Sequence, residues 1–250
     1  MATDSPAADR RTRSGVRAVL LAIGVAVLAF VVGNLLVALA ALVLGLFGIA
    51  LLSAPALQVL VGTVLLQGVA FGGTALLYLR YRGDGLAFLR TRVPTLRDIG
   101  WIVGGFAALL GLLALTQVVF STLGIQSAQN QIVELASGNP IVFLILVPLS
   151  FLLVGPGEEL LFRGLVQGTI AEALHPARAV VLASAIFALV HYGSLAGSGK
   201  FAYLGVVFAL ALVLGATYEL TDNLVVPALI HGAYNAVQFG IQYLAATGGL

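Results

Sequence analysis

Long apolar runs separated by short polar stretches dominate this sequence. A membrane-spanning helix needs about 20 apolar residues, because the hydrocarbon core is roughly 30 Å thick and a helix rises 1.5 Å per residue. The runs do not alternate between polar and apolar positions, so they predict helices and not the strands of a barrel. We therefore predict an all-α fold, a polytopic transmembrane bundle of about seven to eight helices. The segments cover residues 16–52, 56–79, 99–120, 140–173, 179–191, 201–218 and 224–244.

Two of these segments are irregular. The first, residues 16–52, is too long for one ordinary span. It fits either a tilted helix with an interfacial extension or a span followed by a re-entrant piece, and Pro55 ends it. The fourth contains Gly155-Pro156-Gly157 after its apolar part. These three residues predict a break, followed by a helical pattern that carries charges.

Composition narrows the class of protein. Apolar residues make up 60% of the 250 residues and charged residues only 9%. Soluble domains carry about 25% charged residues, so a soluble globular enzyme is excluded. The chain has no cysteine, which excludes disulfides, thiolate metal sites and a cysteine nucleophile. The net charge of +2 gives no reason to expect a nucleic-acid partner.

Basic residues predict the orientation and the organisation of the chain. Nine of the 12 basic residues lie at the N-terminus or in the loop 80–98, and basic loops stay in the cytoplasm. We expect a multi-pass protein of the cell membrane with a cytoplasmic N-terminus and with the loop 126–139 outside. Residues 1–15 are predicted as a disordered polar tail, 16–135 as N-terminal transmembrane helices, and 136–250 as a C-terminal transmembrane core.

The ionisable residues of the C-terminal core lie mainly in three short stretches of apolar sequence. The first contains Glu158, Glu159 and Arg163, the second ends at His191, and the third contains His231 and Asn235. A charge at the bilayer centre is costly, so such residues must face the protein interior or a water-filled cavity. Glu159 and Arg163 are four residues apart and can form an ion pair on one helical face. Glu158 is turned by about 100° from Glu159 and has no such partner.

Two kinds of hydrolytic site are open to this set of residues. Glu158, His191 and His231 could bind Zn²⁺ and leave a position for water. Without a metal, a carboxylate and a histidine could activate water directly, while the Asn235 amide and the second histidine stabilise the oxyanion. In both cases water attacks a carbonyl group. No His-Glu-x-x-His sequence is present, which excludes a zincin-type site.

Other functions compete with hydrolysis. Intramembrane histidines and carboxylates also serve as helix–helix hydrogen bonds or as parts of an ion pathway. A proton-coupled transporter would show broken helices in both halves of the chain, and the sequence has no counterpart of residues 155–157 in its first half. A non-catalytic scaffold or immunity protein is the remaining alternative, although the complete polar set is more than a scaffold needs.

At these residues the sequence resembles the CPBP family of intramembrane proteases, which includes the type II CAAX prenyl endopeptidases. The family motifs are Glu-Glu-x-x-x-Arg, Phe-x-x-x-His and His-x-x-x-Asn, which occur here at 158–163, 187–191 and 231–235. The resemblance implies that residues 136–250 form the catalytic core of a membrane endopeptidase that acts on a membrane-associated or prenylated peptide or protein. It implies that Glu158, His191, His231 and Asn235 are catalytic, supported by Glu159 and Arg163. It leaves open whether a metal is bound.

Overall fold

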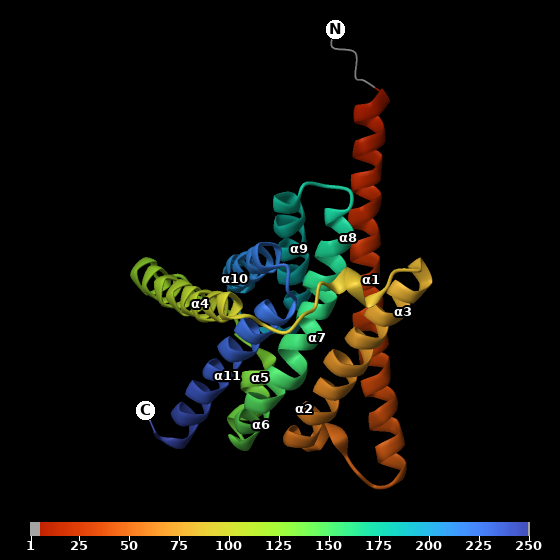
Figure 1. Ribbon diagram of the computed structural model, residues 1–250. Coiled ribbons are helices and arrows are strands. Elements are labelled where there is room, and N and C mark those ends of the chain that lie inside the picture. The colour runs from red at the N-terminus through yellow and green to blue at the C-terminus, as the bar shows by residue number, and fades with distance from the viewer. Residues whose placement is uncertain (1–5, 250) are drawn as a thin grey trace.

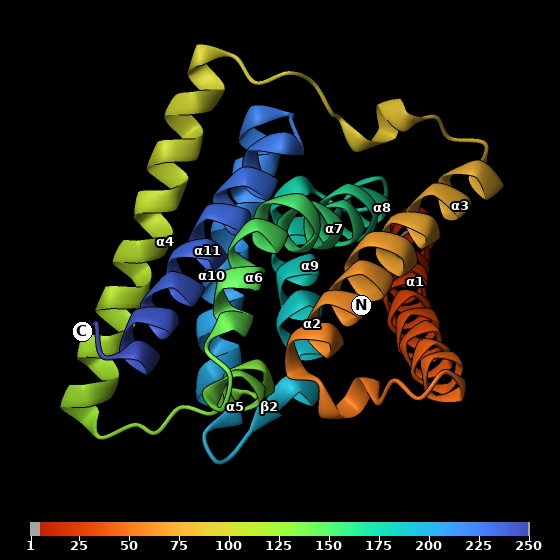
Figure 2. The ribbon, with the colours of Figure 1, turned by 90° about the horizontal axis from the view of Figure 1, so that it is seen from below.

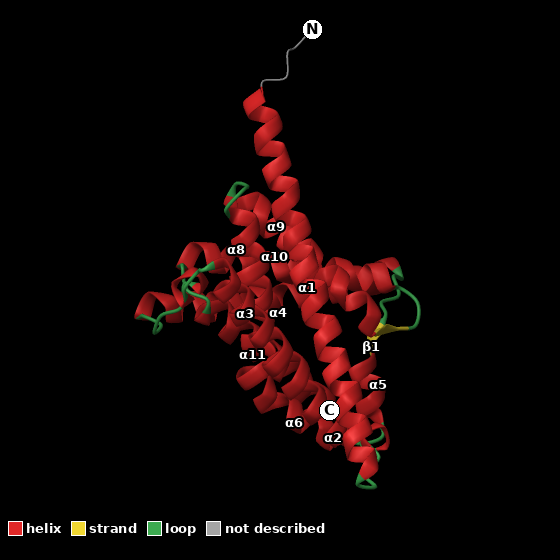
Figure 3. Cartoon of the chain, turned by 90° about the vertical axis from the view of Figure 1, so that its right-hand side faces the viewer, coloured by secondary structure: helices red, strands yellow, loops and turns green. Residues whose placement is uncertain are grey.

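The structure is a computed structural model that describes residues 6–249. Nearly all of the described chain is helical (Figures 1 and 3), which confirms the predicted all-α bundle. Two short strands, β1 (Gln129–Asn130) and β2 (Leu195–Ala196), pair antiparallel and join two connecting loops. The helices are α1 (Pro6–Leu46), α2 (Pro55–Thr63), α3 (Gly72–Arg82), α4 (Leu96–Leu123), α5 (Gln131–Ser137), α6 (Ile141–Leu149), α7 (Gly155–Glu159), α8 (Gly168–Ala171), α9 (Pro176–Val190), α10 (Lys200–Thr221) and α11 (Val225–Thr247).

Six helical segments of the described chain are long and apolar enough to cross a membrane. They agree with the first six segments predicted from hydropathy. The seventh segment forms α11, which is long enough to span but more polar than the other six. The six spans are Ser14–Leu46, Pro55–Arg82, Leu96–Leu123, Ile141–Ala171, Pro176–Ser194 and Lys200–Thr221.

The first apolar run forms one continuous helix. Helix α1 has 41 residues and is therefore about 60 Å long, roughly twice the thickness of the hydrocarbon core. It passes along one side of the bundle and extends beyond it at the N-terminal end (Figure 1). A re-entrant piece is thus absent from this run.

The predicted disordered tail, residues 1–15, overlaps this helix. Its first five residues lie outside the described part, but from Pro6 onward the backbone is helical, so the prediction is wrong for residues 6–15. Alanine and arginine are common in this stretch and have high helix propensity. Extending an existing helix also avoids the cost of nucleation, which explains why the apolar run continues outward as a helix.

The central helix of the bundle runs from Ile141 to Ala171 without the predicted break at Gly155-Pro156-Gly157. Two π-helical segments, Ser150–Val154 and Leu160–Gln167, flank the Gly-Pro-Gly turn and keep the chain helical. Local π geometry can re-satisfy backbone groups that a proline or glycine leaves free within a membrane helix. The prediction of a break was wrong for this reason.

The π-helical segment Leu160–Gln167 lies at the centre of the largest apolar core. All its residues except Leu160 are buried. Helix α1 packs on this core through small side chains, which allow close approach of helix backbones in a membrane. Figure 2 shows α4 on the opposite side, where a long connection joins it to α3. The core of the bundle therefore surrounds the stretch that follows Glu158 and Glu159.

Candidate active site

Glycines bring the helix of the two glutamates against α11. A Cβ atom on Gly155 would lie only 2.7 Å from the carbonyl oxygen of Ala228, and one on Gly232 would lie 2.9 Å from that of Ser150. Any side chain at either position would push the helices apart, so backbone meets backbone at this crossing. His231, next to Gly232 in the chain, consequently faces the turn that carries the glutamates.

A second close contact lies on another face of the same turn. A Cβ atom on Gly157 would lie 2.4 Å from the carbonyl oxygen of Gln67, which belongs to the π-helical segment Val64–Phe71. At about 100° per residue, Glu158 lies on the arc between Gly157 and Gly155. Glu158 therefore points into the angle between the second span and α11.

Glu159 is fully buried and contacts two side chains, those of Arg163 and His231. Its carboxylate lies 3.1 Å from Arg163 Nε, as the spacing of four residues predicts, and 2.8 Å from His231 Nδ1. The Arg163 guanidinium is itself 1% exposed, donates to the carbonyl oxygen of Ala211 at 3.2 Å and lies 4.6 Å from the centre of the Phe187 ring. Glu159 thus compensates a buried cation and fixes an imidazole at the same time.

His231 lies between the two glutamates. An ionised carboxylate can only accept hydrogen bonds, so the N–H at His231 Nδ1 donates a hydrogen bond to Glu159. The other ring nitrogen, Nε2, is 3.9 Å from Oε2 of Glu158, whose side chain remains 13% exposed. This distance is too long for a hydrogen bond and leaves both atoms available to a third group. Glu159 thus contacts Arg163 and His231, whereas Glu158 forms no hydrogen bond with a described residue; the expected division of roles between the two glutamates stays a prediction.

His191 follows the last residue of α9, as predicted, and is half-buried. Its Nδ1 donates to the carbonyl oxygen of Phe187 at 2.7 Å, which leaves Nε2 unbonded. The His191 ring centre is 4.7 Å from that of Phe187, and the His231 ring centre is 6.0 Å from the same phenyl ring. The two imidazoles therefore contact one aromatic side chain from two helices.

Asn235 lies one turn beyond His231 on α11 and is half-buried. Its carboxamide makes no side-chain hydrogen bond to another residue in the part of the chain that the structure describes. The structure thus places Glu158, Glu159, Arg163 and His231 in direct contact or close to it, with His191 across Phe187 and Asn235 one turn away.

The three predicted zinc ligands Glu158, His191 and His231 are not gathered into one cluster in this structure. Between residues 6 and 249, no group of three His, Cys, Asp or Glu side chains is arranged to hold a metal ion. Nδ1 of His231 is bonded to Glu159 and Nδ1 of His191 to a backbone carbonyl, so each histidine keeps Nε2 unbonded, as metal-binding histidines also do. The proposed reaction uses only side chains of this chain.

Two polar residues near the site were missed or underrated from the sequence. Gln167 is fully buried, and its amide donates to Glu219 at 2.7 Å and to the carbonyl oxygen of Gly215 at 3.1 Å. The sequence suggests that Glu219 flanks an interface loop, and offers it only as a weak alternative to the site residues of the third polar stretch. Arg163 and Gln167 lie one helical turn apart, and so do Ala211 and Gly215 on α10, whose carbonyl oxygens they contact. This spacing of four residues was the feature of the sequence that could have indicated Gln167.

Glu219 also ties the central helix to the loop after α3. It accepts from both terminal nitrogens of Arg90 at 3.2 Å, and Arg90 lies 3.9 Å from the centre of the Tyr218 ring. Burial lowers the pKa of the Arg90 guanidinium, but its interactions with Glu219 and Tyr218 together outweigh this and raise the pKa above its ordinary value. Arg90 therefore stays charged, and the contact fastens this polar loop to α10.

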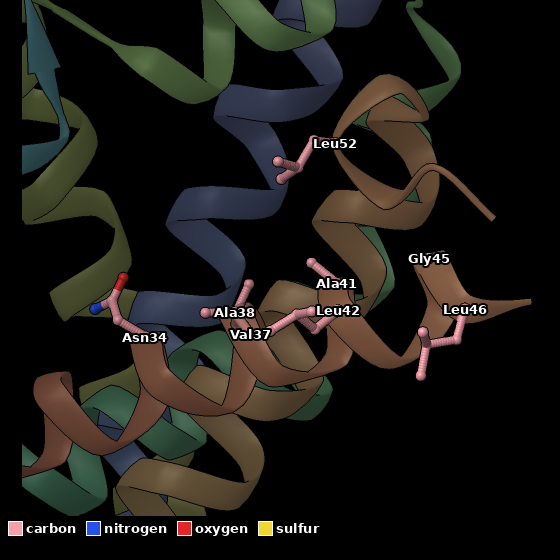
Figure 4. A pocket seen from close by; sticks show the side chains of 8 residues that line it. All are labelled: Asn34, Val37, Ala38, Ala41, Leu42, Gly45, Leu46 and Leu52. Carbon is pink, nitrogen blue, oxygen red and sulfur yellow. The ribbon is translucent and has the colours of Figure 1, made fainter. Parts of the chain in front are cut away.

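A separate apolar groove lies along the C-terminal half of α1, near the turn Leu51–Ser53 that precedes α2 (Figure 4). Small side chains such as Ala38, Ala41 and Gly45 line it, and Asn34 at one end donates to the carbonyl oxygen of Phe30 in its own helix. The groove contains none of the predicted site residues and no group suited to acid–base catalysis. It therefore gives no alternative site.

Comparison with known proteins bears on the C-terminal core. Residues 140–237 match the Rce1-like family model, described as type II CAAX prenyl endopeptidase Rce1-like. This part of the chain is thus similar to that family. The matched segment contains all six predicted site residues, from Glu158 to Asn235, and it confirms the resemblance read from the motifs. The comparisons with curated proteins and with solved structures gave no match.

The family match and the fold together indicate the broad class of this protein. Six apolar helices of the described chain can span a bilayer, which indicates a multi-pass membrane protein, and residues 140–237 are similar to a family of endopeptidases, which are hydrolases. The matched segment begins at the central helix, which leaves residues 1–139 outside it. The two parts are nevertheless packed together, because α1 and the second span contribute to the same core as the central helix.

Proposed function

We propose that the chain is an intramembrane endopeptidase in which Glu158 and His231 activate a water molecule. The observation that carries this proposal is the position of His231 between two carboxylates, with Nδ1 2.8 Å from Glu159 and Nε2 3.9 Å from Glu158. A His held by a buried carboxylate through one nitrogen presents the other nitrogen in a fixed direction. The separation of 3.9 Å admits one water that donates to both groups.

In the proposed reaction, Glu158 is the general base. It takes one proton from the water while His231 Nε2 accepts a hydrogen bond from the other O–H, which stays on the oxygen as that oxygen attacks the carbonyl carbon of the scissile peptide bond. The proton on Glu158 then passes to the leaving amine as the carbon–nitrogen bond breaks. Glu159 acts through His231 and Arg163, so it is a positioning residue.

Oxyanion stabilisation is assigned to Asn235 and His191. The Asn235 carboxamide has no internal partner among the described residues and can donate an N–H to the developing negative charge. His191 donates from Nε2 when it is protonated, because its Nδ1 already donates to a backbone carbonyl. Phe187 lies against both imidazoles, which limits bulk water around them.

The proposed substrate is a membrane-associated peptide or protein. The family description includes prenyl CAAX endopeptidases, which makes a prenylated C-terminal peptide the first candidate. The apolar surroundings of the site suit a substrate that is already held in the bilayer. Within this proposal, cleavage releases a short C-terminal peptide into water.

The test is cleavage of defined peptides by the purified protein in lipid nanodiscs. Fluorogenic peptides that end in a farnesylated CAAX sequence are compared with the same peptides without the farnesyl group, and products are identified by mass spectrometry. We expect cleavage by the wild type and a loss of about 10²-fold or more for Glu158→Gln, as for removal of a general base. Cleavage that persists unchanged in Glu158→Gln would contradict the assignment.

A further inference from the structure

We propose that a row of polar side chains on α11 forms a hydrated path that supplies water to the candidate active site. This inference rests on the proposed function, because hydrolysis consumes one water for each peptide bond broken. The water oxygen enters the new carboxyl group and its hydrogens go to the products, so the site must be refilled after every cycle. The row provides a route for that refilling within the bundle.

The row is defined by helical spacing. His231, Asn235, Gln238 and Gln242 follow one another at intervals of four, three and four residues on α11. At about 100° per residue they lie within roughly 40° of one direction, and they extend for about 16 Å along the helix. An isolated polar residue would have no such repeat, so the spacing indicates one continuous polar face.

This face points into the protein. Val237, Ile241 and Leu244, which lie about 90–150° around the helix from the row, are exposed at the outer surface of the bundle. Phe239 and Tyr243 occupy a third side and pack against the apolar cluster of α6. The polar row faces neither the outer surface nor α6, and its first residue, His231, touches Glu159.

The carboxamides that follow His231 in the row lack hydrogen-bond partners in the part of the chain that the structure describes. The side-chain nitrogen of Gln238 is buried and has no hydrogen bond within residues 6–249. The carboxamides of Asn235 and Gln242 likewise make no side-chain hydrogen bond to the described chain. Unpaired polar groups at membrane depth are unfavourable unless they face water, and water can both donate to and accept from every carboxamide in the row.

The absence of native cysteine permits a direct test of hydration. Single cysteines are introduced at two matched pairs of adjacent positions, Val237 with Gln238 and Ile241 with Gln242. Within a pair the residues lie at nearly the same depth but about 100° apart around α11. The proteins, reconstituted in nanodiscs, are treated with a charged methanethiosulfonate reagent, and folding of each variant is checked by gel filtration and by the midpoint of thermal unfolding.

We expect Gln238→Cys and Gln242→Cys to react about tenfold or more faster than their neighbours Val237→Cys and Ile241→Cys, since only the former meet water. Equal rates within both pairs, whether slow or fast, would overturn the hydrated path. This measurement needs no substrate, so its result is independent of whether the chain proves to be a protease.

Activity gives a second readout if peptide cleavage is established. Gln238→Leu should lower kcat severalfold with little change in KM, because it removes a water-binding group and leaves the catalytic residues in place. Gln238→Asn keeps the carboxamide and should recover most of the rate. The same loss in Gln238→Asn as in Gln238→Leu would show a packing role and would contradict the path.

Discussion

Glu158 and Glu159 are adjacent in the chain, yet they should respond to the same substitution in opposite ways. Glu159→Gln removes the charge that lies 3.1 Å from the Arg163 guanidinium, which is 1% exposed. A buried charge left without its partner costs about 3–5 kcal/mol of unfolding free energy. Glu158→Gln removes a partly exposed carboxylate that makes no ion pair with an arginine, so stability should change by less than about 1 kcal/mol.

The assay follows stability and activity on the same preparations. At roughly 2–4 °C per kcal/mol, Glu159→Gln should lower the midpoint of thermal unfolding in detergent by about 10 °C. Glu158→Gln should unfold like the wild type and lose about 10²-fold or more of its peptide cleavage. The two variants differ by one position and by the same chemical change, so each serves as the control for the other.

A double variant tests whether the stability lost in Glu159→Gln comes from the unpaired charge of Arg163. Glu159→Gln with Arg163→Met removes both charges of the buried pair, and replacing such a pair by uncharged residues is often neutral or stabilising. The double variant should therefore recover much of the stability lost in Glu159→Gln. The reasoning would be refuted if Glu159→Gln were as stable as the wild type, or if Glu158→Gln were the less stable of the two.

Two further predictions concern packing and orientation. Gly232→Ala places a Cβ 2.9 Å from the backbone oxygen of Ser150 and should lower the free energy of unfolding by about 1–3 kcal/mol. Gly240→Ala on the same helix meets nothing within 4 Å and should be neutral or slightly stabilising in thermal unfolding. Equal effects of the two substitutions would contradict the close crossing of the helices. For orientation, an impermeant thiol reagent on intact cells should label Ser127→Cys but not Thr91→Cys until the cells are opened. The reverse labelling would place the basic loop outside.

Much of the bundle follows from local features of the sequence. The six spans were predictable because each depends only on the apolar content of about 20 consecutive residues. The ion pair of Glu159 with Arg163 was predictable for a similar reason, since both residues lie on one helix four positions apart. The family match confirms the motifs as a set, but the role of each site residue remains a prediction.

Other features depend on contacts between distant parts of the chain. The bond from His231 to Glu159 joins residues 72 positions apart, and no periodicity in either helix reveals it. The Gly-Pro-Gly turn was predicted as a break because proline removes a backbone donor. Its glycines instead serve as contact points for α11 and for the second span, which only the packed structure can show.

The π-helical segment Leu160–Gln167 affects the number of residues in the central helix and the direction in which later side chains point. A π turn behaves as if one residue had been inserted into an α-helix, because its hydrogen bonds reach one residue further. Deleting a single residue there would let the chain return to α geometry without breaking the helix. The side chains after the deletion would then keep nearly the same face of the helix, and Gln167 would still face Glu219, whereas a deletion in an α-helical stretch would turn them by about 100°. Sequences that share the Glu-Glu-x-x-x-Arg motif but differ by one residue in this stretch should therefore be aligned by helical face as well as by residue identity.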